Sequence, residues 1–181
     1  MPPFQTCLPM PQALFAVATN NDVTALSQLV NGAYRGESSR RGWTTEADLL
    51  GGIRTDEEGL REMMANPAAQ ILLYIEAEQC LGCVYVEKRA NSLYLGMLTV
   101  SPTYQDKGIG RTLLEAAEAH GRDLNCQTVR MTVIPQRTEL VAWYERRGYR
   151  PTGETHPFPA DDPRFGLPKM ALSFIVLEKT L

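Results

Sequence analysis

The stretch that decides the fold runs Val100-Ser-Pro-Thr-Tyr-Gln-Asp-Lys-Gly-Ile-Gly-Arg-Thr-Leu-Leu114. The apolar residues 93–100 predict a strand, and Pro102 ends it because proline cannot donate to a sheet ladder. Apolar residues at helical spacing from position 109 onward predict a helix. Gly108 and Gly110 therefore lie where a strand leads into a helix. Free N–H groups and the positive end of the dipole at a helix start favour an anion, and glycine leaves room for a phosphate.

Two common phosphate-binding motifs do not match this glycine pair. A nucleotide P-loop has its lysine after the last glycine, whereas Lys107 precedes both glycines here. A dinucleotide fingerprint needs a third glycine, and position 113 is leucine. From the glycine pair alone, an ordinary strand-to-helix turn stays open as an alternative. The segment Gln105–Gly110 resembles the Q/R-x-x-G-x-G/A loop of the GNAT acetyltransferase superfamily, in which this loop holds the pyrophosphate of coenzyme A.

A second segment strengthens the resemblance. Trp143-Tyr144-Glu-Arg-Arg-Gly148-Tyr149 is similar to the aromatic-Tyr-x-x-x-Gly-aromatic signature of the same superfamily. The two segments stand at the separation that the superfamily has, and the resemblance covers residues 14–181. It implies a GNAT-like acyl-CoA N-acyltransferase fold of the α/β (α+β) class, with a mixed, mostly antiparallel central sheet flanked by helices.

Length and composition are those of an ordinary globular protein. The chain has 181 residues, of which 44% are hydrophobic and 22% charged, with a net charge of −3, enough for one domain with a sizeable core. This charge gives no field that would steer the protein to nucleic acid or an anionic membrane, and no apolar run could span a bilayer. Residues 1–11 lack a basic residue, so we expect a loose leader rather than a secretory signal, followed by a single domain over residues 12–181.

The four cysteines, Cys7, Cys80, Cys83 and Cys126, are interpreted as structural thiols. Cys80 and Cys83 have zinc-type spacing, but no second pair follows, and residues three apart on a strand face opposite sides. The two histidines stand alone in the sequence. We therefore expect no metal site, and a reducing, cytoplasmic compartment.

The first part of the chain predicts one strand and a series of helices. Residues 13–18 predict a short strand, followed by a helix whose apolar stripe runs from Val23 to Ala33. After a polar segment, Thr44 or Thr45 can cap a helix over Glu46–Leu50. A further helix is expected over Asp56–Ala65.

The second part predicts an antiparallel meander followed by a crossover. The meander strands are 70–76, 80–88 and 92–100. A helix crosses from the third strand to a strand over 129–133, so these two strands should lie parallel. We expect the sheet to splay where they meet. The remaining elements are a helix over 139–147 capped by Thr138, a strand from Tyr149, and a last strand over 171–178.

The resemblance also implies where acetyl-CoA binds. Backbone groups of Leu98, Thr99 and Val100 would meet the pantetheine arm and the thioester. The loop and the start of its helix would hold the pyrophosphate, through Gln105, Asp106, Lys107, Gly108, Ile109, Gly110, Arg111 and Thr112. For the side chains of Lys107 and Arg111, a solvated basic pair is an equal alternative to phosphate contact.

Acetyl transfer to an amine needs a neutral amine, a polarised thioester carbonyl and a proton for the leaving thiolate. The resemblance implies that Tyr144 is the general acid, and a hydroxyl of pKa about 10 suits an alkyl thiolate. Many members have a glutamate, the water-mediated base, where this chain has Tyr94, and an asparagine where it has Arg137. The base is therefore open at Tyr94. This favours an α-amine of pKa near 8 over a lysine amine near 10.4.

Acceptor recognition is expected within residues 34–54, because the loop and its flanking helices serve the cofactor and the core. This segment combines aromatic and charged side chains suited to a small polar ligand: Tyr34, Arg35, Trp43, Glu46, Asp48 and Arg54. Glu46 is the first choice to contact the amine, and the alternative is that it only stabilises the start of its helix. Arg35 or Arg54 could pair with a carboxylate if the acceptor is an amino acid.

These observations predict an acetyl-CoA-dependent N-acetyltransferase in which the neutral amine of a small molecule attacks the thioester directly. The expected partners are acetyl-CoA and a small-molecule amine, without nucleic acid, membrane or metal, and a homodimer is left open. Two alternatives remain. A protein or peptide N-acetyltransferase would have an open peptide groove. A non-catalytic acyl-CoA-binding sensor would bind the cosubstrate without turnover, and Tyr144 argues against it.

Overall fold

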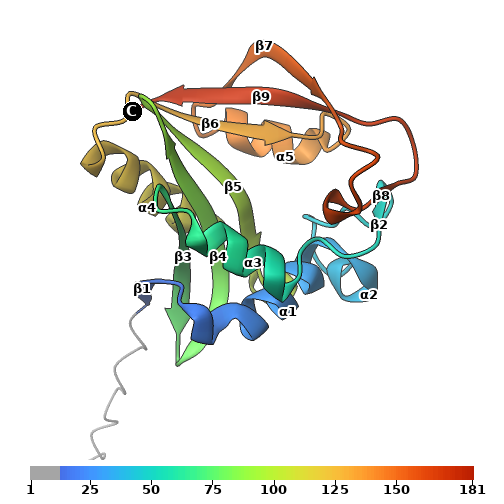
Figure 1. Ribbon diagram of the computed structural model, residues 1–181, viewed down its shortest axis with the longest axis horizontal. Helices are drawn as coiled ribbons and strands as arrows, with labels where there is room; N and C mark the ends of the chain where they lie inside the picture. Colours follow the sequence, from blue (N-terminus) through green and yellow to red (C-terminus); the bar gives the residue numbers. More distant parts are fainter. Residues whose placement is uncertain (1–12) are drawn as a thin grey trace, which may run out of the picture.

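The computed structural model of the protein describes residues 13–181 and contains a seven-stranded sheet (Figure 1). The expected leader over residues 1–11 lies outside the described residues. The strand order is β1-β3-β4-β5-β6-β9-β7. The bounds are β1 Leu14–Val17, β3 Ala69–Glu76, β4 Gln79–Arg89, β5 Ser92–Val100, β6 Thr128–Val133, β7 Arg150–Pro157 and β9 Ser173–Thr180. In this sheet β5 and β6 are parallel, and the other neighbouring pairs are antiparallel. A small second sheet pairs β2 (Leu50–Gly51) with β8 (Leu167–Pro168).

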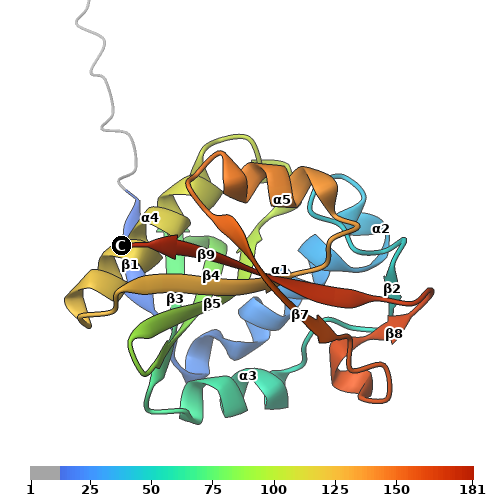
Figure 2. The same cartoon turned by 90° about the horizontal axis from the view of Figure 1, so that it is seen from above.

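Helices cover both faces of the large sheet. Their bounds are α1 Val23–Tyr34, α2 Gly36–Ser39, α3 Glu57–Ala65, α4 Ile109–Asp123 and α5 Thr138–Glu145, with short 3₁₀ turns at Asn20–Asp22, Pro102–Tyr104 and Pro163–Phe165. Figure 2 shows α4 and α5 on one side of the sheet and α1 and α3 on the other. Within residues 13–181, none of these helices is long and apolar enough to cross a bilayer.

Two apolar cores follow from the alternation of side chains along the central strands. β5 sends Leu93 and Leu95 into the core with Leu113 of α4. Alternation alone would place Met97 on the face of Leu93 and Leu95, but the bulge at Met97 turns its side chain into the other core, with Val30 of α1. Leu93, Leu113 and Val30 have no exposed surface. A period of two on strands and 3.6 on helices brings these residues face to face, so the predicted meander and its flanking helices are confirmed.

The sheet opens between its two parallel strands. β5 pairs with β6 only where Ser92–Tyr94 meets Thr128–Arg130, and beyond this point the strands diverge (Figure 1). On the other edge of β5 the register with β4 shifts, and Met97 adopts a φ of 51°, as expected of a bulge rather than a regular strand. The predicted parallel pair and its splay are confirmed. In the described part of the chain, no strand pairs with residues 95–100 on the edge of β5 that faces the splay.

The prediction that Cys80 and Cys83 face opposite sides of the sheet is wrong. The register between β3 and β4 shifts after Tyr74, so Cys80 pairs with Ile75 and Cys83 with Leu73. A bulge inserts one residue and reverses the face of those beyond it, and both cysteines therefore lie against the α1 side. Burial raises the pKa of the Cys83 thiol to about 12, and burial also raises that of Cys80. Both values fit packed, unreactive thiols.

The predicted helix over Glu46–Leu50 does not form. These residues make a single turn, in which the N–H of Leu50 donates to the Glu46 carbonyl at 2.8 Å. Leu50 then enters β2, opposite Pro168 of β8. Its partner strand is distant in the sequence, so the local pattern could not reveal this pairing.

Candidate active site

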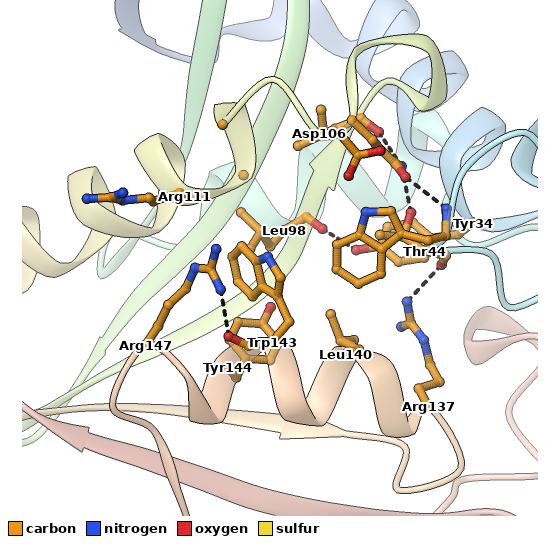
Figure 3. A pocket seen from close by; sticks show the side chains of 15 residues that line it. Tyr34, Thr44, Leu98, Asp106, Arg111, Arg137, Leu140, Trp143, Tyr144 and Arg147 are labelled. Atoms are coloured by element: carbon orange, nitrogen blue, oxygen red, sulfur yellow. Dashed lines mark hydrogen bonds between the residues drawn. The ribbon is translucent and has the colours of Figure 1, made fainter.

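A cavity of about 310 Å³ lies at the splay between β5 and β6 (Figure 3). Its wall comes from the end of β5, the start of α4, α5 and the segment around the end of α1. The lining residues are Tyr34, Trp43, Thr44, Leu98, Val100, Gln105, Asp106, Gly108, Gly110, Arg111, Arg137, Leu140, Trp143, Tyr144 and Arg147. The cavity is therefore lined by residues from three expected groups: those that bind the cofactor, those that take part in catalysis, and those that bind the acceptor.

The start of α4 presents free backbone N–H groups to this cavity. Gly108 is the N-cap, with a φ of 82°, and it offers the helix no side-chain cap. Asp106 also lies in the left-handed region, with a φ of 68°. A Cβ on Gly110 would lie 3.6 Å from Trp143 and from Val100, which is ordinary contact, and a Cβ on Gly108 would meet nothing within 4 Å. The loop and helix start therefore fit a bound anion such as a pyrophosphate.

The charged side chains of the loop already have protein partners. The Lys107 Nζ lies 4.6 Å from the centre of the Tyr104 ring. The Arg111 Nε donates to the Glu115 Oε1 at 2.8 Å. Phosphate contact by either side chain would require it to leave this partner, so the backbone amides have the stronger geometric support.

Besides Lys107, which also lies outside it, three of the predicted cofactor residues do not line the cavity: Ile109, Thr112 and Thr99. Ile109 is 4% exposed and packs into the core. The Thr112 hydroxyl donates to the Gly108 carbonyl at 3.0 Å. Thr99 is 1% exposed, and its hydroxyl donates to the Met97 carbonyl at 2.9 Å. Their side chains stabilise the helix start and the bulge.

Gln105 joins the loop before α4 to the segment after α1. Its Oε1 accepts from the backbone N–H of Trp43 at 3.0 Å. Its Nε2 donates to the Thr44 hydroxyl at 2.9 Å and to the Val100 carbonyl at 3.1 Å. A Cβ on Gly42 would lie 2.5 Å from the Gln105 Oε1, so glycine is needed for this close approach. The side chain of Gln105 is thus a tether between two walls of the cavity.

Tyr144 lies on α5, is 4% exposed, and lines the cavity. The rings of Trp143 and Tyr149 pack edge-on against it, with centroids at 5.0 and 5.7 Å. No group within residues 13–181 forms a hydrogen bond with its hydroxyl. Burial raises the pKa of Tyr144 far above its ordinary value, Tyr34 adds to the rise, and Arg137 opposes it. The hydroxyl therefore stays protonated through the neutral range but is a weaker acid than an ordinary tyrosine. Burial in the same cavity would also raise the pKa of a thiol formed there, and this keeps proton transfer from Tyr144 to the thiolate feasible.

Leu98 and Val100 bring the end of β5 to the cavity wall (Figure 3). Tyr34, which is 6% exposed, donates a hydrogen bond from its hydroxyl to the Leu98 carbonyl. The guanidinium groups of Arg137 and Arg54 lie over the Tyr34 ring, 5.6 and 5.7 Å from its centre. Tyr34 therefore fixes the end of α1 against the strand that borders the splay.

Glu46 is buried between two arginines. Its Oε2 pairs with Arg35, and its Oε1 accepts from the Arg137 Nη1 at 2.7 Å, while its side chain is 8% exposed. Burial pushes the pKa of Glu46 upward, but Arg137, Arg54 and Arg35 together outweigh burial and hold the pKa below its ordinary value. Glu46 thus lies outside any helix and does not cap one, which corrects the alternative interpretation of this residue. Both of its oxygens are already ion-paired.

The structure places the predicted acceptor residues in different environments. Tyr34 and Trp43 line the cavity. Arg35 is buried, and its Nη2 donates to the Phe165 carbonyl at 3.4 Å. Arg54 instead lines a neighbouring groove of about 670 Å³. Asp48 lies apart from these residues, in an exposed pair with Arg40 at 3.0 Å. The cavity therefore holds two aromatic residues of the predicted set, and the acceptor site itself stays a prediction.

Tyr94 does not line the cavity. Its hydroxyl lies 3.3 Å from the Thr132 Oγ1 on β6, just beyond the last paired residues of the splayed strands. The Arg89 guanidinium lies 4.0 Å from the centre of the Tyr94 ring. Tyr94 thus bridges the two strands next to a separate hollow of about 430 Å³.

In the sequence, Arg137 stands out only as a departure from the family pattern, whereas in the structure its side chain connects several segments. Besides its bond to Glu46, its Nη2 donates to the Thr44 carbonyl at 2.7 Å. Arg137 occupies the N-cap position of α5 without a capping bond, and Thr138 is the first helical residue rather than the predicted cap. The unusual residue type at position 137 was a signal, but its partners are distant in the sequence.

Within residues 13–181, no three His, Cys, Asp or Glu side chains are grouped as metal ligands.

Comparisons with known proteins agree with this geometry. Residues 50–158 match the family model described as Acetyltransferase (GNAT) domain, a range that includes the start of α4 and all of α5. The uncharacterized N-acetyltransferase YjhQ of Escherichia coli K12 is 26% identical over 156 residues, which cover 82% of this chain and 76% of that protein.

Solved structures show the same fold at low sequence identity. The ribosomal-protein-S18-alanine N-acetyltransferase from Escherichia coli has a TM-score of 0.68 at 13% identity, covering 93% of this chain and 94% of that chain. The structure of yncA from Salmonella typhimurium with its cofactor acetyl-CoA has a TM-score of 0.67 at 16% identity, covering 94% of each chain.

Proposed function

The chain belongs to the GNAT family of acetyltransferases, and on this premise we propose that it transfers the acetyl group of acetyl-CoA to the neutral amine of a small molecule. The family match spans more than half of the chain. The similar structure from Salmonella typhimurium holds acetyl-CoA, which supports the same cosubstrate here. The small amine is inferred from the site itself.

One observation carries the proposal: a single cavity joins the uncapped start of α4 to the hydroxyl of Tyr144. An acyl-CoA has an anionic pyrophosphate at one end of its arm and a thioester at the other. The helix start suits the anion, and the buried hydroxyl suits the thioester end. Between them lies the edge of β5 at residues 98–100, which has no strand partner on the side of the splay.

Each part of the cavity has a role in this proposal. The backbone N–H groups around Gly108 and Gly110 bind the pyrophosphate, and the edge of β5 orients the arm. Acetyl-CoA supplies an acetyl group activated as a thioester. The amine nitrogen forms a C–N bond with the acetyl carbon, the C–S bond breaks, and Tyr144 donates the proton of its hydroxyl to the sulfur. The proton that the amine nitrogen loses passes to water, and Tyr144 is reprotonated from solvent. Because burial keeps the pKa of Tyr144 high, the proton stays in place until it is needed.

The proposal assigns no protein base to the amine. Both oxygens of Glu46 are ion-paired and its pKa is low, so it would accept a proton poorly. Tyr94 lies outside the cavity. An acceptor that supplies its own neutral amine is therefore favoured. A lysine side chain, with a pKa near 10.4, meets this condition less readily than an α-amine.

Thermal melting and a thiol-release assay test the proposed function together. Coenzyme A at about 100 times its Kd should stabilise the protein by roughly 2.7 kcal/mol, and thiol release from acetyl-CoA should occur with small amines. Turnover with peptides alone would favour a peptide acetyltransferase. A melting shift without turnover of any acceptor would favour a non-catalytic sensor, and the absence of a shift would contradict the cosubstrate.

A further inference from the structure

We propose that the acceptor is an α-amino acid with an apolar side chain, and that Arg54 binds its carboxylate. This inference rests on the acetyl transfer proposed above and names the substrate class of the same site. Four features of the structure support it: the charge of the arginine cluster, the position of Arg54, the anchoring of its backbone, and the groove beside it.

The arginine cluster has more positive than negative charge. Arg35, Arg54 and Arg137 all act on one carboxylate, that of Glu46. Arg35 and Arg137 occupy its two oxygens. Within residues 13–181, the side chain of Arg54 has neither an ion pair nor a hydrogen bond. A guanidinium left without an anion beside a ligand cavity is suited to bind a carboxylate through two parallel hydrogen bonds.

Arg54 lines the groove, and the Tyr34 ring stands between it and the cavity. Its guanidinium is 5.7 Å from the centre of the Tyr34 ring, and Tyr34 lines the cavity and bonds to the Leu98 carbonyl. Arg54 itself lines the groove. A carboxylate on Arg54 would therefore lie one aromatic ring away from the strand end proposed to orient the thioester. The α-amine of an amino acid is one carbon away from its carboxylate, so it can face the cavity.

The anion at this position is not the pyrophosphate of the cosubstrate. Gly108 and Gly110 line the cavity and not the groove. The guanidinium groups also have a second effect, because nearby cations disfavour an ammonium and favour the neutral amine. The carboxylates of Asp56, Glu58 and Glu62 in the groove act in the opposite direction, so this effect requires an amine that lies on the arginine side, away from α3. The cluster would thus help the acceptor lose its proton at a site where we assign no protein base.

The backbone of Arg54 is anchored although its side chain is free. Asn31 of α1 accepts from the Arg54 N–H at 2.7 Å and from the Thr55 N–H at 3.3 Å. The Asn31 Nδ2 donates to the Thr55 carbonyl at 2.8 Å. A side chain that is presented from a fixed backbone loses less freedom when a ligand binds.

The groove beside Arg54 has an exposed apolar wall. Ile53, Phe165 and Leu167 line it, and they are 53%, 42% and 58% exposed. Large apolar side chains that are grouped in a hollow and left in solvent favour an apolar ligand group that would cover them. The side of α3 adds carboxylates to the same groove, those of Asp56, Glu58 and Glu62. They disfavour an acidic side chain on the acceptor.

Matched acceptors test the inference directly in the thiol-release assay. L-leucine should exceed L-leucinamide and L-aspartate in kcat/KM by about 10- to 100-fold, when rates are expressed per neutral amine, because the amide lacks the charge and aspartate lacks the apolar side chain. Arg54→Gln should slow leucine by a similar factor and leave leucinamide unchanged. Arg54→Lys should keep part of the preference, since lysine retains the charge without the planar fork.

Arg61→Gln is the matched control, because Arg61 lies on α3, pairs with Glu57 at 2.8 Å and does not line the groove. It should leave both rates unchanged. The melting shift with coenzyme A should be intact in every variant. Equal rates for leucine and leucinamide, or an equal loss of both in Arg54→Gln, would overturn the inference while acetyl transfer stands. Absence of both the melting shift and turnover would contradict the proposed function, and the inference would fall with it.

Discussion

At the scale of the residue, two neighbouring tyrosines differ in what their hydroxyls touch. Tyr144 has no hydrogen-bond partner within residues 13–181 and faces the cavity. The Tyr149 hydroxyl donates to the buried Glu118 carboxylate at 3.1 Å, which also accepts from Lys179 at 2.8 Å. Burial raises the pKa of both tyrosines. The Tyr144 hydroxyl is therefore available to take part in the reaction, whereas the Tyr149 hydroxyl holds Glu118 of α4 in place.

Tyr144→Phe should bind coenzyme A normally and turn over about 10²- to 10⁴-fold more slowly, the usual contribution of a general acid. Removal of its hydroxyl leaves no protein group unpaired, so stability should change little. Because the pKa of Tyr144 is raised, wild-type kcat should show no loss from this group as the pH rises to about 10. Steady-state kinetics and melting with coenzyme A measure both effects.

Tyr149→Phe is the matched control for this prediction. It removes a hydroxyl that is bonded to Glu118, so it should lower stability by about 1 kcal/mol and leave kcat in place. If Tyr144→Phe keeps the wild-type kcat, then another group or water protonates the thiolate.

At the scale of the element, the start of α4 depends on two glycines for different reasons. Gly108 has a φ of 82°, a conformation that other residues adopt only with strain. Gly110 has helical geometry, and a Cβ there would touch Trp143 and Val100 at 3.6 Å. One glycine allows the turn, and the other leaves space in the cavity wall.

Gly110→Val should abolish the melting shift with coenzyme A, whereas Gly110→Ala should keep most of it. The alanine Cβ makes ordinary contacts. The two further methyl groups of valine must press on Trp143 and Val100 or enter the space proposed for the pyrophosphate. Differential scanning fluorimetry over a range of coenzyme A concentrations separates the two variants. An undiminished shift in Gly110→Val would place the pyrophosphate elsewhere.

At the scale of the whole molecule, the Glu46 side chain connects segments that are distant in the sequence. Through Arg35 it reaches the end of α1 and the Phe165 carbonyl before β8. Through Arg137 it reaches the start of α5. Loss of one partner from a buried ion pair costs about 3–5 kcal/mol, because a buried charge is left uncompensated.

Glu46→Gln should therefore lower the free energy of unfolding at neutral pH by several kcal/mol, with the loss shrinking in acid. The pKa of Glu46 in the folded protein lies below its ordinary value of 4.5. Its contribution is thus fully present above that value and is lost as the pH falls through the lower, folded-state pKa. Urea unfolding of both proteins across this range measures the difference.

Asp48→Asn provides the control, since Asp48 forms an exposed pair with Arg40 at 3.0 Å. Exposed pairs contribute little, so this variant should unfold like the wild type throughout. A constant difference between Glu46→Gln and wild type at all pH values would mean that the loss comes from packing and not from charge.

The sequence by itself determined the elements whose pattern is local. The alternation in residues 70–100 predicted the meander, and the glycines at 108 and 110 predicted a helix start able to hold an anion. The crossover helix required a parallel pair, and the two GNAT-like segments implied the family that the comparisons then showed. Each of these predictions rests on a pattern of neighbouring residues, or on the rule that a helical crossover joins two parallel strands.

Only the tertiary structure decided the features that depend on distant partners. One bulge placed Cys80 and Cys83 on the same face, and a pairing with β8 replaced the helix expected at Glu46–Leu50. The same fold pairs Arg35 and Arg137 with Glu46, whereas the side chain of Arg54 has no ion pair among the described residues. Sequence spacing cannot predict these outcomes, because a side chain's role depends on which charges meet it in space.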